Sequence, residues 1–146
     1  MDALRNCHRM LVDDGVLLDL HPIPPSMHAF SRGRDLGVVD ERPFFRLVRA
    51  TERELARVVA EGLFAHETET ELDVIERFET SDELFETVDA WEHIHLSKRL
   101  RGRVARAAPP IDLHEGLVLR RYRRTRARFP QPPESHQRRV RLRVSS

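Results

Sequence analysis

The residues from Arg9 to Pro25, RMLVDDGVLLDLHPIPP, constrain the fold of this chain more than any other stretch. A short amphipathic helix ends at an acidic turn around Gly15, and the apolar stretch Val16–Leu20 follows. Because the first three residues of that stretch are all apolar, we expect a strand that is covered on both faces, as is typical of parallel strands flanked by helices. The prolines that follow, at 22, 24 and 25, are expected to end it.

The patterns that follow alternate between helix and strand, which indicates an α/β domain. Pro43 in a first turn and Gly62 at the end define one long helix. At 146 residues the chain is long enough for one domain, which we place at residues 1–124, with residues 125–146 as an Arg-rich disordered tail. The expected elements are a turn or loop at Ser31–Gly37, a helix from Asp40 to Gly62, a strand at Glu69–Phe78, helices at Thr80–Trp91 and Ser97–Ala107, and a strand at Leu113–Arg123.

The net charge of +1 hides two blocks of opposite charge. Residues 120–146 carry 10 arginines against one glutamate, whereas residues 1–119 carry 15 Lys and Arg against 23 Asp and Glu. Such a tail could neutralise nucleic-acid phosphates, but only Tyr122 and Phe129 are available there to stack on bases. We therefore favour a solvent-exposed tail without a nucleic-acid partner, and keep nucleic-acid binding through the tail as an alternative function.

The segment Ala3–Pro22, ALRNCHRMLVDDGVLLDLHP, resembles the part of class I S-adenosylmethionine-dependent methyltransferases in which a helix leads through a turn into the fifth strand. This resemblance implies an α/β fold corresponding to the C-terminal half of a Rossmann-like methyltransferase. Its elements would be one parallel-type strand, a connecting helix and an antiparallel strand pair with flanking helices. The matching residues are Ala3, Leu4, Cys7, Arg9, Leu11 and Gly15, while Asp13 and Asp14 replace the usual Pro-Gly.

The cofactor half of that family has no counterpart in these 146 residues. The family binds its cofactor at a glycine-rich turn after the first strand, where the missing side chains allow close approach to a helix N-terminus. No Gly-x-Gly pattern occurs here. The resemblance therefore implies S-adenosylmethionine as the cofactor of the intact fold and no cofactor for this chain, which would be truncated and inactive or incomplete alone. Its parent activity would be methyl transfer to a small acceptor, and a non-catalytic binding or regulatory module derived from the fold is the alternative.

The opening strand carries the expectation about partners. In the family the fifth strand lies inside the sheet, so without its neighbours Val16–Leu20 becomes an apolar edge with unpaired backbone groups. We expect such an edge to associate with a second copy of the chain or with a separate N-terminal half. No apolar run is long enough to cross a membrane or to direct secretion, so we expect a cytoplasmic protein without a membrane partner.

Four residues are candidates for the substrate side of the site. Asp19 and His21 are expected at the carboxyl end of the opening strand, where open α/β sheets place ligands. The resemblance also places His28 in a loop facing the acceptor, and Trp91 near the acceptor pocket. Each has a structural alternative: Asp19 could bind a backbone group, His21 could pack beside a proline, and Trp91 could complete the apolar stripe of its helix.

The sequence predicts no metal site. His93 and His95 follow a helix, and no cysteine or second histidine pair completes a ligand set. The single cysteine, Cys7, excludes an internal disulfide and lies on the apolar stripe of the first helix, where we expect it to be a core residue.

Overall fold

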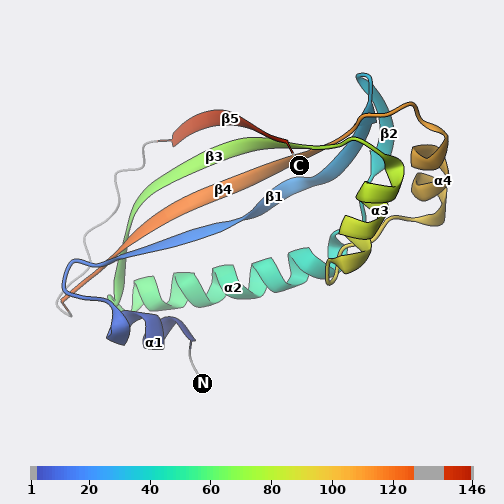
Figure 1. Cartoon of the computed structure of the whole chain (residues 1–146). Helices are drawn as coiled ribbons and strands as arrows, with labels where there is room; N and C mark the ends of the chain where they lie inside the picture. Colours follow the sequence, from blue (N-terminus) through green and yellow to red (C-terminus); the bar gives the residue numbers. More distant parts are fainter. Residues whose placement is uncertain (1–2, 127–136, 146) are drawn as a thin grey trace.

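The computed structural model describes residues 3–126 and 137–145, and its backbone forms four helices and five strands within those ranges (Figure 1). Helix α2 runs along one side of a long twisted sheet, and α3 and α4 gather with β2 at one end of it. The elements are α1 (Ala3–Met10), β1 (Val16–Ser31), β2 (Arg34–Val38), α2 (Arg42–Ala60), β3 (Phe64–Phe78), α3 (Ser81–Ala90), α4 (Lys98–Arg106), β4 (Ile111–Arg124) and β5 (Gln137–Ser145).

The sheet has the strand order β2-β1-β4-β3-β5, so the α/β class and the antiparallel pair β3–β4 are confirmed. β1 is antiparallel to both of its neighbours, β2 and β4, which makes the expectation of a parallel-type opening strand wrong. Only β5 runs parallel to its partner, β3. Of the tail expected at residues 125–146, residues 127–136 lie outside the described residues, and Gln137–Ser145 form β5.

The expectation that β1 is covered on both faces is also wrong. Leu17 packs against the cluster beneath α2, but Leu18 and Leu20 on the other face are 61% and 56% exposed. Successive side chains of a strand point to opposite faces, and in the described part of the chain α1 and α2 pack on the Leu17 side here. A run of apolar residues therefore indicates a strand, but it does not show that both faces are buried.

β1 also continues ten residues beyond His21, to Ser31, instead of ending at the prolines. Pro22 still pairs with Leu117 of β4, and the register shifts between Ile23 and His28, where β1 bulges away from β4. Proline lacks a backbone donor and is tolerated at bulges and on strands with an open edge. β1 meets both conditions, because within the described residues β2 covers its outer edge only from His28 to Ser31.

Helix α2 forms as the sequence predicts. Pro43 lies in its first turn, Asp40 Oδ1 accepts a hydrogen bond from the Arg42 N–H at 3.2 Å, and Gly62 follows the helix at φ +74°. The C-terminal half of α2 packs on the sheet through Leu55 and Val58, which bury against two aromatic residues, Phe64 of β3 and Tyr122 of β4. Cys7 of α1 is only partly buried, so it is not the core residue expected.

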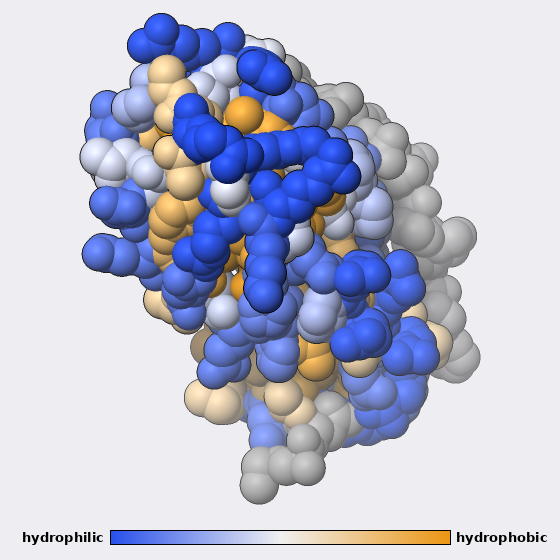
Figure 2. All heavy atoms as spheres, turned by 90° about the vertical axis from the view of Figure 1, so that its right-hand side faces the viewer, coloured by the Kyte–Doolittle hydropathy of each residue, from blue (hydrophilic) through white to orange (hydrophobic). Residues whose placement is uncertain are grey.

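The second part of the core lies at the end formed by β2, α3 and α4. Thr80 caps α3 as predicted, because its Oγ1 accepts from the Glu83 N–H at 3.1 Å. This end presents a mainly hydrophilic surface with small apolar areas between the polar side chains (Figure 2). Its buried residues include Ala29, Val39, Phe78, Leu84, Val88, Leu100, Val104, Ile111 and Leu113.

Candidate functional site

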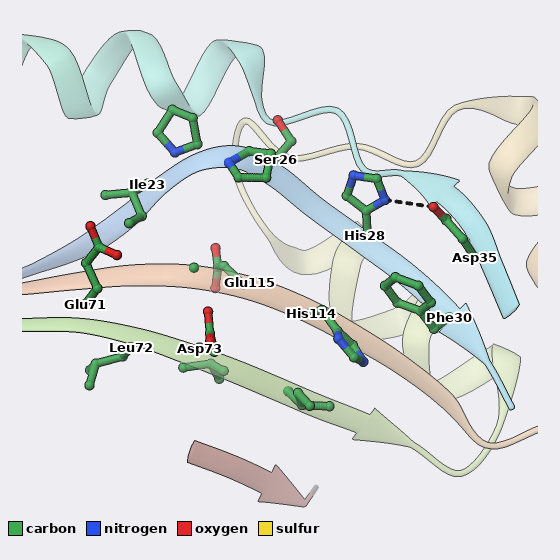
Figure 3. A pocket seen from close by; sticks show the side chains of 15 residues that line it. Ile23, Ser26, His28, Phe30, Asp35, Glu71, Leu72, Asp73, His114 and Glu115 are labelled. Atoms are coloured by element: carbon green, nitrogen blue, oxygen red, sulfur yellow. Dashed lines mark hydrogen bonds and ion pairs between the residues drawn. The ribbon is translucent and has the colours of Figure 1, made fainter. Parts of the chain in front are cut away.

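A groove of about 540 Å³ crosses β1, β4 and β3 at the bulge of β1 (Figure 3). The bulge leaves four residues, Pro24 to Met27, without partners on β4, and this separation of the strands opens the groove. Gly116 of β4 keeps it open, because a Cβ at this position would lie 3.3 Å from Ile23 Cγ1. The polar and aromatic residues lining the groove are Ser26, His28, Phe30, Asp35, Glu71, Asp73, His114 and Glu115.

One end of the groove is aromatic. The Phe30 ring lies between two imidazoles, with centroid separations of 6.2 Å to His28 and 4.4 Å to His114. His28 is held from β2, where Asp35 Oδ2 lies 3.2 Å from its Nδ1 (Figure 3). The tautomer of His28 is therefore directed by a carboxylate, which leaves Nε2 as the nitrogen able to exchange a proton with a ligand.

A carboxyl pair lies beside the groove. Glu41, fully buried just before α2, accepts a hydrogen bond from the Met27 N–H through Oε2, while its Oε1 is buried without a hydrogen-bond partner among the described residues. Burial, followed by the negative charge of Glu41, raises the pKa of Glu115 to about 7, and burial also raises the pKa of Glu41. Two ionised carboxylates close together in a buried site repel one another, so Glu115 keeps its proton up to near neutral pH and brings it to the groove wall.

A second polar cluster lies between the sheet and α2. Asp19 Oδ2 is 3.0 Å from His21 Nδ1, and Glu52 Oε1 of α2 is 3.3 Å from His21 Nε2. Arg120 of β4 joins Glu52 to Glu69 of β3, at 3.0 and 2.7 Å. Burial lowers the pKa of Arg120, but its hydrogen bonds to the two glutamates outweigh burial and raise that pKa above its usual value.

This cluster fixes α2 to the sheet and encloses His21. The side chains of Asp19 and His21 are only 15% and 10% exposed, and both nitrogens of the ring face carboxylates. Such a histidine is well oriented but has little contact with solvent or with a dissolved ligand. The geometry therefore gives Asp19 and His21 a structural role beneath α2. The polar side chains that a dissolved ligand can reach are those that line the groove.

The structure brings together only some of the predicted site residues. Asp19 and His21 pair with one another, but they lie in the middle of β1 and not at its carboxyl end, because the strand continues through the prolines. His28 lies in β1 and not in the expected loop, and it lines the groove. Trp91 packs against the core at the end of α3, a cluster that includes neither Asp19 nor His21.

The carboxyl pair and the role of Arg120 were not predicted from the sequence. Arg120 begins the Arg-rich block that was expected to be exposed to solvent, yet its side chain is 21% exposed and forms two ion pairs. The alternation of side chains along β4 could have indicated that Arg120 points inward. Arg120 shares a strand face with Val118 and Tyr122, which are both buried. Nothing in the sequence around Glu41 indicates that this residue is buried.

The described residues contain no group of three or more His, Cys, Asp and Glu side chains arranged to hold a metal ion. Every helix in the described ranges is too short or too polar to span a bilayer. No protein-family model, curated protein or solved structure matches this chain.

Proposed function

We propose that this chain is the acceptor-side half of a methyltransferase-like protein whose cofactor half is supplied by another segment or another chain. The parent activity would be methyl transfer from S-adenosylmethionine to a small acceptor. In support, α1, β1, α2, β3 and β4 follow one another in the order that the resemblance implies, and β3 and β4 form the implied antiparallel pair.

The open edge of β1 is the observation that carries this proposal. β4 pairs with β1 from Val16 to Ile23, while no strand of the described chain pairs with the other edge of this segment. The exposed Leu18 and Leu20 lie on the face away from α2. An apolar strand with an unpaired edge and an uncovered face indicates a missing neighbour that supplies both a strand and a covering layer.

The groove supports the acceptor side of the proposal. The resemblance assigns the segment Pro22–His28 to the face that meets the acceptor, and residues 23–26 and His28 line the groove. His28, oriented by Asp35, is the residue best placed to accept a proton from an acceptor nucleophile. Phe30 beside it offers an apolar surface for a small organic ligand.

The described residues do not fit the cofactor. A glycine-rich cofactor turn leads from a strand into a helix, and the part of the chain that the structure describes has two such junctions, at Val39–Glu41 before α2 and at Glu79–Thr80 before α3. Neither contains glycine. Glycines with positive φ lie instead in the β1–β2 hairpin and after α2. We therefore derive no methyl-transfer step within this chain.

Isothermal titration calorimetry of the purified chain with S-adenosylmethionine tests this assignment. We expect no measurable heat of binding, because no cofactor turn is present. A tight, stoichiometric heat would show that the chain holds a cofactor site of its own and would overturn the proposal of a missing half.

A stand-alone binding module is the second candidate, because residues of β1, β2, β3 and β4 complete the groove without any further half. The coding DNA upstream of Met1 separates the two candidates. A strand, a glycine-rich turn and a helix encoded there in the same reading frame would support the methyltransferase-like protein, whereas a stop codon close upstream would favour the binding module.

A further inference from the structure

Five arginines lie on one face of α2, spaced by four, three, four and four residues. In an α-helix these spacings return to nearly the same side, so the five side chains form a single row. The row faces away from the sheet, because the buried residues of the helix, Val48, Leu55 and Val58, occupy the opposite face. We call this row, which consists of Arg42, Arg46, Arg49, Arg53 and Arg57, the arginine row.

The three central members of the arginine row are available to a partner. Arg42 pairs with Asp40, and Arg57 pairs with acidic residues on its own side of the helix. Arg46, Arg49 and Arg53 are exposed and have no hydrogen bond or ion pair with any residue that the structure describes. All three line one shallow depression on α2. Glu52 also lines this depression, but its carboxylate is paired with Arg120 of β4, so the three guanidinium groups there favour the binding of an anion with several charges.

The surroundings of the row indicate which anion. The side chain of Ala56 lies in the same depression, and a residue this small allows a ligand to approach the helix closely. Leu47 is the one large apolar residue of α2 that is strongly exposed, at 49%. A helix that binds a membrane surface inserts a broad apolar face, and the apolar face of α2 is already buried against the sheet. The row is therefore suited to a polyanion that binds by charge alone.

We propose that the arginine row binds the phosphate backbone of a nucleic acid. Arginine pairs with phosphate through two parallel hydrogen bonds, and successive phosphates supply single charges along a line. Arg57 lies 15 positions after Arg42, so the row spans about 22 Å, the length of about six phosphates along one strand of a duplex. The row contacts no bases in this arrangement, so the binding is independent of sequence.

Fluorescence anisotropy of the full chain with labelled 20-nucleotide RNA, single-stranded DNA and duplex DNA tests this proposal. The test variant is R46Q/R49Q/R53Q, and the control variant, R32Q/R34Q/R99Q, removes the same charge from three exposed arginines elsewhere. At about 100 mM NaCl we expect the test variant to bind at least about tenfold more weakly. Its slope of log affinity against log salt should fall by about 2 to 3, as for three lost phosphate contacts. The control should change affinity less than about threefold.

Two further measurements keep the result specific to the row. R46K/R49K/R53K retains the charge and should recover most of the affinity, while circular dichroism should show all variants folded. The proposal is overturned if the test and control variants lose affinity equally, or if the wild type binds no oligonucleotide at about 50 mM NaCl. It is equally overturned if the protein binds vesicles containing phosphatidylserine but no oligonucleotide. The same holds if the variant R138Q/R139Q/R141Q/R143Q loses oligonucleotide binding while the test variant retains it.

Discussion

Glu115 on β4 lies close enough to Glu41, the fully buried residue that precedes α2, for the negative charge of Glu41 to act on its carboxyl group. The pKa of each is raised above its ordinary value of 4.5, that of Glu115 to about 7. The folded protein therefore binds protons at this pair more tightly than the unfolded chain does. The stabilisation is fully present below about pH 4.5 and is lost as the pH rises through 7.

We predict that the pair makes the protein less stable at pH 8 than at pH 5, by about 1 to 2 kcal/mol from this source. Glu115→Gln should remove most of that difference, because glutamine carries no proton that titrates near neutral pH. Urea unfolding followed by the fluorescence of Trp91, at several pH values, measures the effect. Glu71→Gln, on the neighbouring strand and in the same groove, should keep the slope of the wild type. An unchanged pH slope in Glu115→Gln would show that the pKa of Glu115 is not raised by its burial beside Glu41.

Arg120 provides a second prediction. Replacing it with methionine should destabilise the protein by about 1 to 3 kcal/mol, because Glu52 and Glu69 would lose the guanidinium group that pairs with both of them. The matched control is Arg121→Met on the same strand. The side chain of Arg121 is 45% exposed and pairs with Glu67. An exposed pair is worth less than about 1 kcal/mol. Equal losses of stability in the two variants would contradict the view that Arg120 connects α2 to the sheet.

Local signals in the sequence were sufficient for the elements whose ends depend on local chemistry. Pro43 and Gly62 mark the ends of α2, and the cap at Thr80 marks the start of α3, because each acts within a few residues of itself. The two later strands were also found, although β3 begins five residues before the predicted strand.

The errors concern residues whose environment is set by distant parts of the chain. The prolines of β1 are compatible with a strand only because the edge is open and a bulge separates them from β4, and neither condition is visible locally. Arg120 points inward because Glu52 and Glu69, 68 and 51 residues away, meet it there. The groove likewise depends on a register shift between β1 and β4, so its lining could not be read from spacing along one strand.

The cap of α3 leads to a third prediction. Thr80 Oγ1 accepts from the Glu83 N–H, and the Glu83 carboxylate in turn accepts from the Glu79 N–H at 2.9 Å. Thr80→Ala should lower the free energy of unfolding by about 1 kcal/mol, while Thr80→Ser should retain most of it. The thermal unfolding midpoints of the two variants measure this difference. Identical midpoints would indicate that α3 begins without help from the threonine side chain.

The last prediction concerns the open edge of β1, where we expect the isolated chain to self-associate. Leu20 pairs with Leu119 of β4, and its side chain is 56% exposed on the face that no helix of the described chain covers. Two copies that join through their β1 edges would pair these backbone groups and place the exposed leucines of one copy beside those of the other. Light scattering after size-exclusion chromatography should therefore give a mass above 17.1 kDa that rises with concentration.

Leu20→Lys should return the mass to that of the monomer, because a charge on the apolar face opposes the close approach of a second edge. Val38→Lys is the matched control, since Val38 is 50% exposed on β2 and lies outside the open segment of β1. This control should associate like the wild type. A wild-type protein that remains a monomer at every concentration would show that the β1 edge does not require a neighbour, and would remove the main support for a missing half.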